Sequence, residues 1–229
     1  MDTFVANALL RDLLIGYMTL FSIINPFGIA FVFHAKTRRL SEESRLALSR
    51  QVGFYSFIVL VVSLFMGSQV LRFFGITIPA LRIAGGLVVA LSGWAMLSAS
   101  DDAGETATDD VHNSHSDDMA FFPLTVPLTT GPGTIAAAIA LGAIRLDNLG
   151  HLVGSVITSV LLAATVAGTI FYAYSRASTF SRVVGREGTR VITRLSAFLL
   201  MCVGVQIVLT GVSDVLPSLI AQGVESRRQ

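Results

Sequence analysis

The stretch FSIINPFGIAF (residues 21–31) is an apolar run that the motif NPFG interrupts in its middle. Pro26 has no backbone N–H, its ring crowds the carbonyl four residues earlier, and it disfavours helical geometry at Asn25. Gly28 is expected to take backbone angles that are closed to other residues. The sequence therefore predicts a break inside a segment that otherwise looks like a membrane-spanning helix.

The composition is that of a membrane protein. Of the 229 residues, 53% are hydrophobic and 14% charged, whereas a soluble domain carries about 25% charged residues. The mean hydropathy is +0.71. Continuous apolar stretches of roughly 18 residues or more indicate transmembrane helices, while a β-barrel needs alternating strands. Six stretches are predicted to span the membrane: Leu9 to Ala35, Val52 to Phe74, Ile78 to Leu97, Met119 to Ile144, Leu149 to Tyr174 and Val191 to Val212.

The basic residues indicate the orientation. Lys and Arg gather between the first and second stretches and between the fifth and sixth. By the positive-inside rule these loops are cytoplasmic, so both termini are predicted on the extracytoplasmic side of the plasma (inner) membrane. Trp94, Tyr172 and Tyr174 lie near predicted cytoplasmic ends and are interpreted as an aromatic belt. The net charge of +1 gives no reason to expect nucleic acid.

A polar segment divides the chain into two halves. Residues 99–118 hold seven Asp and Glu residues and no Lys or Arg, which predicts a solvated cytoplasmic linker. His112 and His115 have irregular spacing there, so neither a metal site nor another cofactor is expected. The halves, residues 1–98 and 119–229, each contain three predicted spans. An odd number of spans inverts the second half, and the fold class expected is all-α with two inverted three-helix repeats.

Two alignments support a repeat. Arg82-IAGG and Arg194-LSAF each open the last span of a half, at an offset of 112 residues. At an offset of 106, Pro26 falls on Pro132, which lies in the motif LTTGPGT (residues 128–134). Gly/Pro breaks in corresponding spans of two halves indicate a binding site near the midplane. The first and fourth helices are therefore predicted to be discontinuous and to form that site.

The chemistry of such breaks suits a small zwitterion. Half-helix N-termini, expected after Gly28 and after Gly133, present N–H groups to a carboxylate. The carbonyls before Pro26 and Pro132 are expected to receive an ammonium group. The side chains added to the predicted site are Ser22, Asn25, Thr129, Thr130 and Thr134.

Charged residues are absent from the centres of the predicted spans. Asp214 and His34 lie near span ends, and both are interpreted as interfacial polar residues, with proton coupling as the alternative. The coupling ion, a proton or sodium, is left open, as is a homo-oligomeric state.

The motifs FSIINPFG, Arg82-IAGG and VPLTTGPGTIA, with the six-span layout, resemble the MarC family of bacterial and archaeal inner-membrane proteins. The resemblance covers essentially the whole chain. It implies transport of small neutral amino acids such as glycine and alanine, with discontinuous first and fourth helices lining the site. Carried onto this chain, it points to Asn25, Pro26, Gly28, Thr130, Gly131, Pro132, Gly133 and Thr134.

The leading hypothesis is a secondary transporter of glycine- or alanine-like amino acids that alternates access around a midplane site in the bilayer. An efflux pump or a channel for other small solutes is the alternative. A membrane-embedded enzyme is disfavoured, because catalysis needs a protonatable set, and the spans contain neither paired aspartates nor an HExxH motif. The chain is therefore expected not to be an enzyme.

Overall fold

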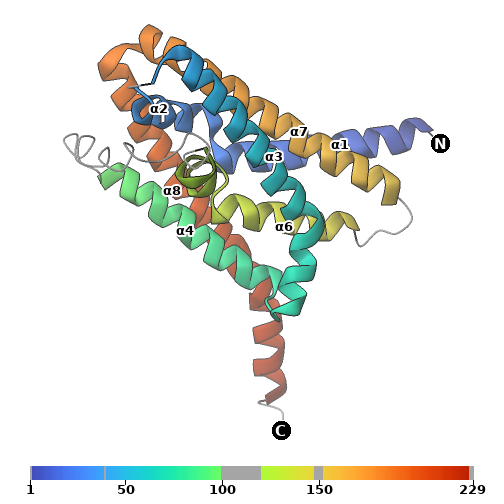
Figure 1. Ribbon diagram of the computed structural model, residues 1–229. Helices are drawn as coiled ribbons and strands as arrows, with labels where there is room; N and C mark the ends of the chain where they lie inside the picture. The colour runs from blue at the N-terminus through green and yellow to red at the C-terminus, as the bar shows by residue number, and fades with distance from the viewer. Residues whose placement is uncertain (1, 39, 99–119, 147–151, 227–229) are drawn as a thin grey trace.

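The computed structural model describes residues 2–38, 40–98, 120–146 and 152–226, and every element in this part of the chain is a helix. Figure 1 shows the helices gathered into one bundle. α8 is interrupted at Gly185, where φ is 74° and ψ is 178°. In chain order the elements are α1 (Asp2–Ile24), α2 (Pro26–Lys36), α3 (Glu42–Phe73), α4 (Ile78–Ser98), the π-helix η3 (Ala120–Thr129), α6 (Pro132–Leu146), α7 (Leu152–Ser175) and α8 (Ala177–Ser226).

Five helical segments in the described residues are long and apolar enough to cross a membrane. They are Leu9–Lys36, Glu42–Phe73, Ile78–Ser98, Gly154–Ser175 and Glu187–Pro217. The fourth predicted stretch is instead divided between η3 and α6, whose apolar part Pro132–Ala143 is shorter. A continuous helix of about 20 residues is needed to cover the hydrocarbon core. Six full spans are therefore not confirmed, and the polar linker lies outside the described residues.

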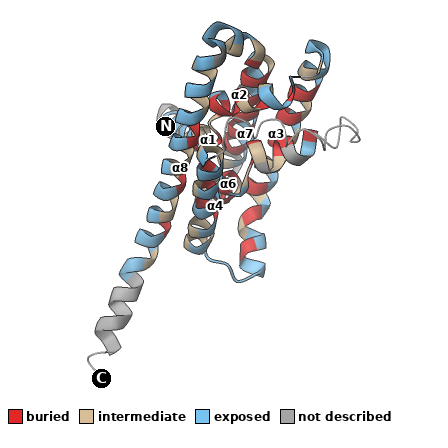
Figure 2. Ribbon diagram, turned by 90° about the vertical axis from the view of Figure 1, so that its left-hand side faces the viewer, coloured by how far each residue is buried: buried red, intermediate tan, exposed pale blue. Residues whose placement is uncertain are grey.

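The bundle is apolar outside as well as inside. Only 22% of the apolar window in α4 is buried, and Leu87, Leu91 and Trp94 are exposed. Figure 2 shows buried residues on the inner faces of the helices and exposed residues on the outer faces. Contiguous apolar surface of this kind marks an interaction site, and lipid is its natural partner in a bundle of long apolar helices. The fold is that of an all-helical membrane protein.

α4 and α8 make the most extensive contact between helices in the described residues, side by side and antiparallel (Figure 1). Gly86 of α4 lies against Gly204 of α8, and Gly93 lies against Ala197. A Cβ on Gly204 would stand 2.3 Å from the amide nitrogen of Ala90, so only glycine permits this approach. Helices in lipid associate through such small residues, because lipid tails are as apolar as the side chains and supply no hydrophobic driving force.

Replacing Gly204 with alanine tests this interface. The added methyl group would strike the α4 backbone, and we expect Gly204→Ala to lower the free energy of unfolding by about 1–3 kcal/mol. Thermal unfolding in detergent measures the effect. Gly168→Ala is the matched control, because a Cβ on Gly168 of α7 meets nothing within 4 Å. Equal melting temperatures for the two variants would contradict the role assigned to Gly204.

Candidate functional site

The first helix break is made by Asn25 together with Pro26. Asn25 has φ 45° and ψ 59°, and it is the non-glycine residue with positive φ in the described chain. Asparagine tolerates this left-handed conformation better than most residues. Its Oδ1 accepts a hydrogen bond from the amide of Gly28 at 3.3 Å, which makes Asn25 the N-cap of α2. Pro26 then occupies the first helical position, where its missing N–H costs nothing.

The expectation for Gly28 was wrong in one respect. Gly28 lies inside α2 and has no positive φ, so the strained angles belong to Asn25. Glycine is needed at this position because a Cβ would lie 2.4 Å from the Oγ of Ser196 in α8. The half-helix consequently begins at Pro26 instead of after Gly28.

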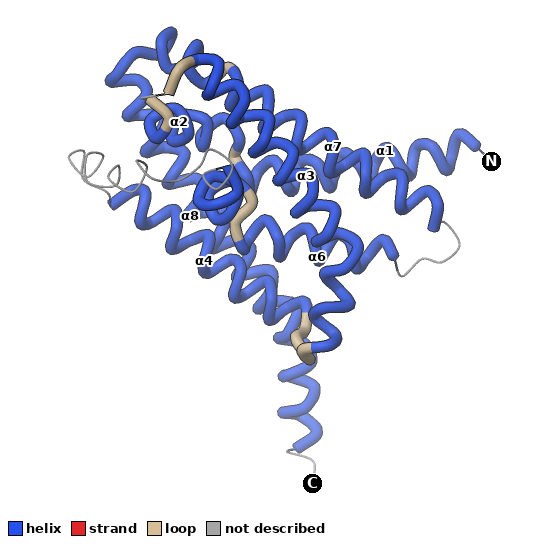
Figure 3. The backbone as a smooth tube through the Cα atoms, viewed as in Figure 1, coloured by secondary structure: helices blue, strands red, loops and turns tan. Residues whose placement is uncertain are grey.

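The second break joins η3 to α6 through Thr130 and Gly131. Figure 3 shows this short loop in the middle of the molecule. α6 begins at Pro132, so this half-helix too starts with a proline, and it starts earlier than predicted. Gly133 allows α6 to meet α4, since a Cβ there would stand 1.9 Å from Cγ2 of Val89. Neither Gly131 nor Gly133 has a positive φ.

The helix before the second break is a π-helix, which the sequence did not predict. The amide of Thr130 donates to the carbonyl of Thr125 at 2.8 Å, a bond across five residues. The hydroxyls of Thr125, Thr129 and Thr130 donate to carbonyls five residues earlier, at 2.6, 2.6 and 3.1 Å. Runs of π-helix are rare and frequently occur at functional sites. The Thr129 and Thr130 protons are thus used inside η3, which leaves their oxygens as acceptors.

Tyr174 does not belong to an aromatic belt, contrary to the prediction, because its side chain is completely buried. Its hydroxyl lies 2.7 Å from the Oγ1 of Thr129, and its ring stacks on Phe33 at 4.5 Å. Since the Thr129 proton goes to the Leu124 carbonyl, Tyr174 is the donor in this pair. Tyr174 of α7 therefore ties α2 to η3 behind the two breaks. Trp94 and Tyr172 are exposed, as a belt requires.

A cavity of about 330 Å³ lies between the two breaks. Pockets for drug-sized ligands occupy roughly 300–1,000 Å³, so this volume suits a small solute. Residues next to both breaks line the cavity, α4 forms a further wall, and Lys36 is the charged residue among them. The lining is Ile23, Ile24, Ile29, Lys36, Val88, Val89, Ser92, Ala95, Met96, Leu128, Thr129, Gly131, Pro132, Thr134 and Leu200.

The cavity includes part of the predicted site. Its wall contains Thr129, Gly131, Pro132 and Thr134. Thr130 and Gly133 are buried beside it without lining it, and Ser22 is exposed on α1. The other three predicted site residues, Asn25, Pro26 and Gly28, form the first break but do not line the cavity.

The carbonyls directly before the prolines are already used as acceptors. The oxygen of Asn25 accepts from the amide of Ile29 at 3.0 Å, and that of Gly131 accepts from Ile135 at 3.1 Å. The carbonyls deprived of a helical donor by proline are those four residues earlier. One of these belongs to Leu128, which lines the cavity.

The α4 wall and Lys36 were missed by sequence reasoning. Ser92 lines the cavity, and its hydroxyl donates to the carbonyl of Val88 at 2.8 Å. The available signal was the pair of glycines in Arg82-IAGG, because a Cβ on Gly85 would lie 2.8 Å from the Cβ of Ala136 in α6. A glycine at a helix contact identifies a close approach but not the helix that approaches.

A membrane-embedded helical bundle with a small cavity between two helix breaks places the chain among polytopic integral membrane proteins. Residues 10–216 match the family described as "MarC family integral membrane protein", and the chain belongs to that family. It is 32% identical to the "UPF0056 inner membrane protein MarC" of Citrobacter koseri, covering 94% of this chain and 98% of the relative. The protein of the same name from Escherichia coli K12 is 30% identical, over 88% and 94%. No solved structure matches significantly. The chain is thus a multi-pass inner-membrane protein.

Removing the Tyr174 hydroxyl tests the tie behind the breaks. We expect Tyr174→Phe to cost about 0.5–1.5 kcal/mol of stability, because a buried hydrogen bond between α7 and η3 is lost while the stacking on Phe33 stays. Tyr172→Phe changes an exposed ring two residues away and should leave thermal unfolding unchanged. The tie is refuted when both variants melt like the unmodified protein.

Proposed function

We propose that this chain is a secondary transporter of small neutral amino acids of the glycine and alanine type. The observation that supports this most directly is that one small cavity is lined by residues of the second helix break and by residues next to the first. Paired breaks in membrane helices are the places where transporters hold their substrates. The proposed role involves no chemical step on the substrate.

The groups around the cavity are complementary to a zwitterion. In α2, which starts next to the cavity, the Gly28 amide already donates to Asn25. α6 starts in the wall of the cavity, where the amides of Gly133 and Thr134, which follow Pro132, have no intrahelical acceptor. These N–H groups and the positive end of the helix dipole favour a carboxylate. The hydroxyl oxygens of Thr129 and Thr134, with the Leu128 carbonyl, are acceptors for the ammonium group. Ile23, Ile29 and Val89 enclose the remaining space, which favours a small apolar side chain.

Contacts across the bundle support two inverted repeats, residues 1–98 and 119–229. α2 of the first half meets α8 of the second through Gly28 and Ser196. α6 of the second half meets α4 of the first through Gly133 and Gly85. A Cβ on Gly85 would lie 3.6 Å from the Cα of Gly133. Each half-helix thus uses one glycine to pack on the last helix of the other half, as a pseudo-two-fold axis requires. In this scheme η3 and α6 together form the fourth of six spans, and the halves rock around the cavity.

Counterflow in proteoliposomes tests the transport proposal. We expect exchange of labelled glycine or alanine, with larger amino acids and hydrophobic drugs exchanging far more slowly. Exchange of drugs or other solutes without small amino acids would favour the efflux pump or the channel instead. Thr134→Val should raise the KM for alanine roughly tenfold, because a hydrogen bond to a charged ammonium is lost. Thr165→Val on the exposed face of α7 is the control and should leave KM unchanged.

The proposed orientation has its own test. With both termini extracytoplasmic, alkaline phosphatase fused after residue 229 should be active, since this enzyme needs an oxidising compartment. A green fluorescent protein fused at the same place should be dark. A dark phosphatase fusion together with a bright fluorescent fusion would reverse the topology.

A further inference from the structure

A second cavity of about 260 Å³ lies along the same helices. Ile23 of α1 lines both cavities. On each helix that lines both cavities, the residues that line the second cavity lie further toward one end of the bundle. On α4 the lining moves from residues 88–96 to Arg82, and on the antiparallel α8 it moves from Leu200 to Thr210. The two cavities are therefore consecutive, and Ile23 stands between them.

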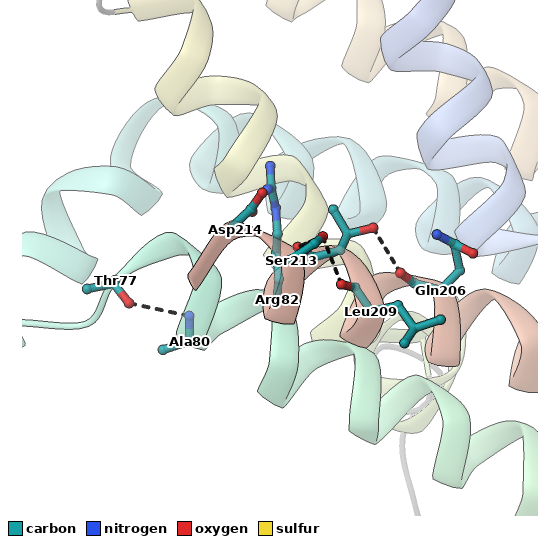
Figure 4. A network of polar contacts seen from close by, with 8 residues as sticks. Thr77, Ala80, Arg82, Gln206, Leu209, Ser213 and Asp214 are labelled. Atoms are coloured by element: carbon teal, nitrogen blue, oxygen red, sulfur yellow. Dashed lines mark hydrogen bonds and ion pairs between the residues drawn. The ribbon is translucent and has the colours of Figure 1, made fainter. Parts of the chain in front are cut away.

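The second cavity differs from the first in its charged residue, which is an arginine paired with an aspartate instead of Lys36. Arg82 lines it and forms an ion pair with Asp214 of α8. Figure 4 shows the Arg82 side chain rising from α4 beside Asp214. The two side chains are 24% and 38% exposed, so the pair is neither sealed in the core nor fully solvated. A guanidinium group is the side chain best shaped to bind a carboxylate with two parallel hydrogen bonds.

Acceptors for an ammonium group lie in the same wall. The hydroxyls of Thr19 and Thr210 donate to carbonyls of their own helices, Ile15 at 2.8 Å and Gln206 at 2.9 Å. Both threonines line the cavity, and because their protons are engaged, their oxygens are available to a ligand as acceptors only. Ala137 and Ala140 of α6 also line the cavity. Arg82 and the two threonines therefore line a space for a small side chain, and Asp214 lies next to this lining as the ion-pair partner of Arg82.

We propose that this second cavity is a peripheral binding subsite for the same small neutral amino acid, and that the substrate inserts into the Arg82–Asp214 pair. The carboxylate takes the Asp214 position on Arg82, and the ammonium group is received by Asp214 with Thr19 or Thr210. A zwitterion replaces both halves of the ion pair, whereas a simple anion or cation would leave one charge unpaired. This inference rests on the proposed transport function and adds Arg82 and Asp214 as substrate-binding residues.

The test measures KM for alanine from each face of the membrane, in proteoliposomes sorted by the accessibility of a C-terminal tag. We expect Arg82→Gln to raise KM roughly 10- to 100-fold from the face on which the C-terminus lies, because a hydrogen-bonded charge pair with substrate is lost. The KM from the other face should change less than twofold. Arg82→Lys should recover part of the affinity, since it keeps the charge but not the planar fork.

Two further variants separate binding from folding. Arg82→Gln combined with Asp214→Asn removes the pair without leaving a lone charge, and it should show the same one-sided loss with an unchanged melting temperature. Arg11→Gln, at an exposed arginine of α1, is the control for lost charge. An unaltered KM in the Arg82 variants, or an equal rise from both faces, overturns the subsite while leaving the transporter proposal intact. Wild-type protein that exchanges no small amino acid overturns both.

Discussion

A proline inside a membrane helix removes one amide donor. The carbonyl that loses this donor cannot be hydrogen-bonded by water instead, because the hydrocarbon core contains none. An unpaired backbone group there costs several kcal/mol, so the break must be enclosed by protein or open onto a polar cavity. Pro26 and Pro132 impose this constraint twice. The arrangement of the other helices follows from it, because α3, α4, α7 and α8 enclose the two interruptions and the small space between them.

Glycines and threonines make this enclosure feasible. Gly28 and Gly133 bring the half-helices onto α8 and α4 at distances no side chain would allow. The threonines of η3 supply hydroxyl donors along a helix that contains two prolines, and Tyr174 fixes this helix from behind. The same small residues that satisfy packing therefore leave a cavity whose walls carry amides, carbonyls and hydroxyls. A polar site is built here almost without charged side chains, which the bilayer would penalise.

The sequence predicted the breaks well and their internal roles less well. Pro26 and Pro132 were placed correctly because proline acts on its own backbone, whatever surrounds it. The angles assigned to Gly28 belong to Asn25, because close packing of α2 on α8 required glycine for its missing Cβ. Tyr174 was taken for an interfacial residue because it lies near a span end, yet it is completely buried and contacts Phe33 and Thr129 of η3. The π-helix was missed because the apolar sequence of η3, which contains Pro123 and Pro127, has no distinctive period.

Hydropathy and the effect of proline on the backbone are local properties. The sequence by itself therefore determined that the chain is a membrane protein, which residues form most of its helices, and at which residues two of the predicted spans break. The tertiary structure alone decided which surfaces face each other across those breaks. The α4 wall of the first cavity and the Arg82–Asp214 pair of the second join segments far apart in the chain. In a helix whose faces are all apolar, hydrophobicity does not distinguish a lipid-facing surface from a cavity wall, and only the packing of neighbouring helices does.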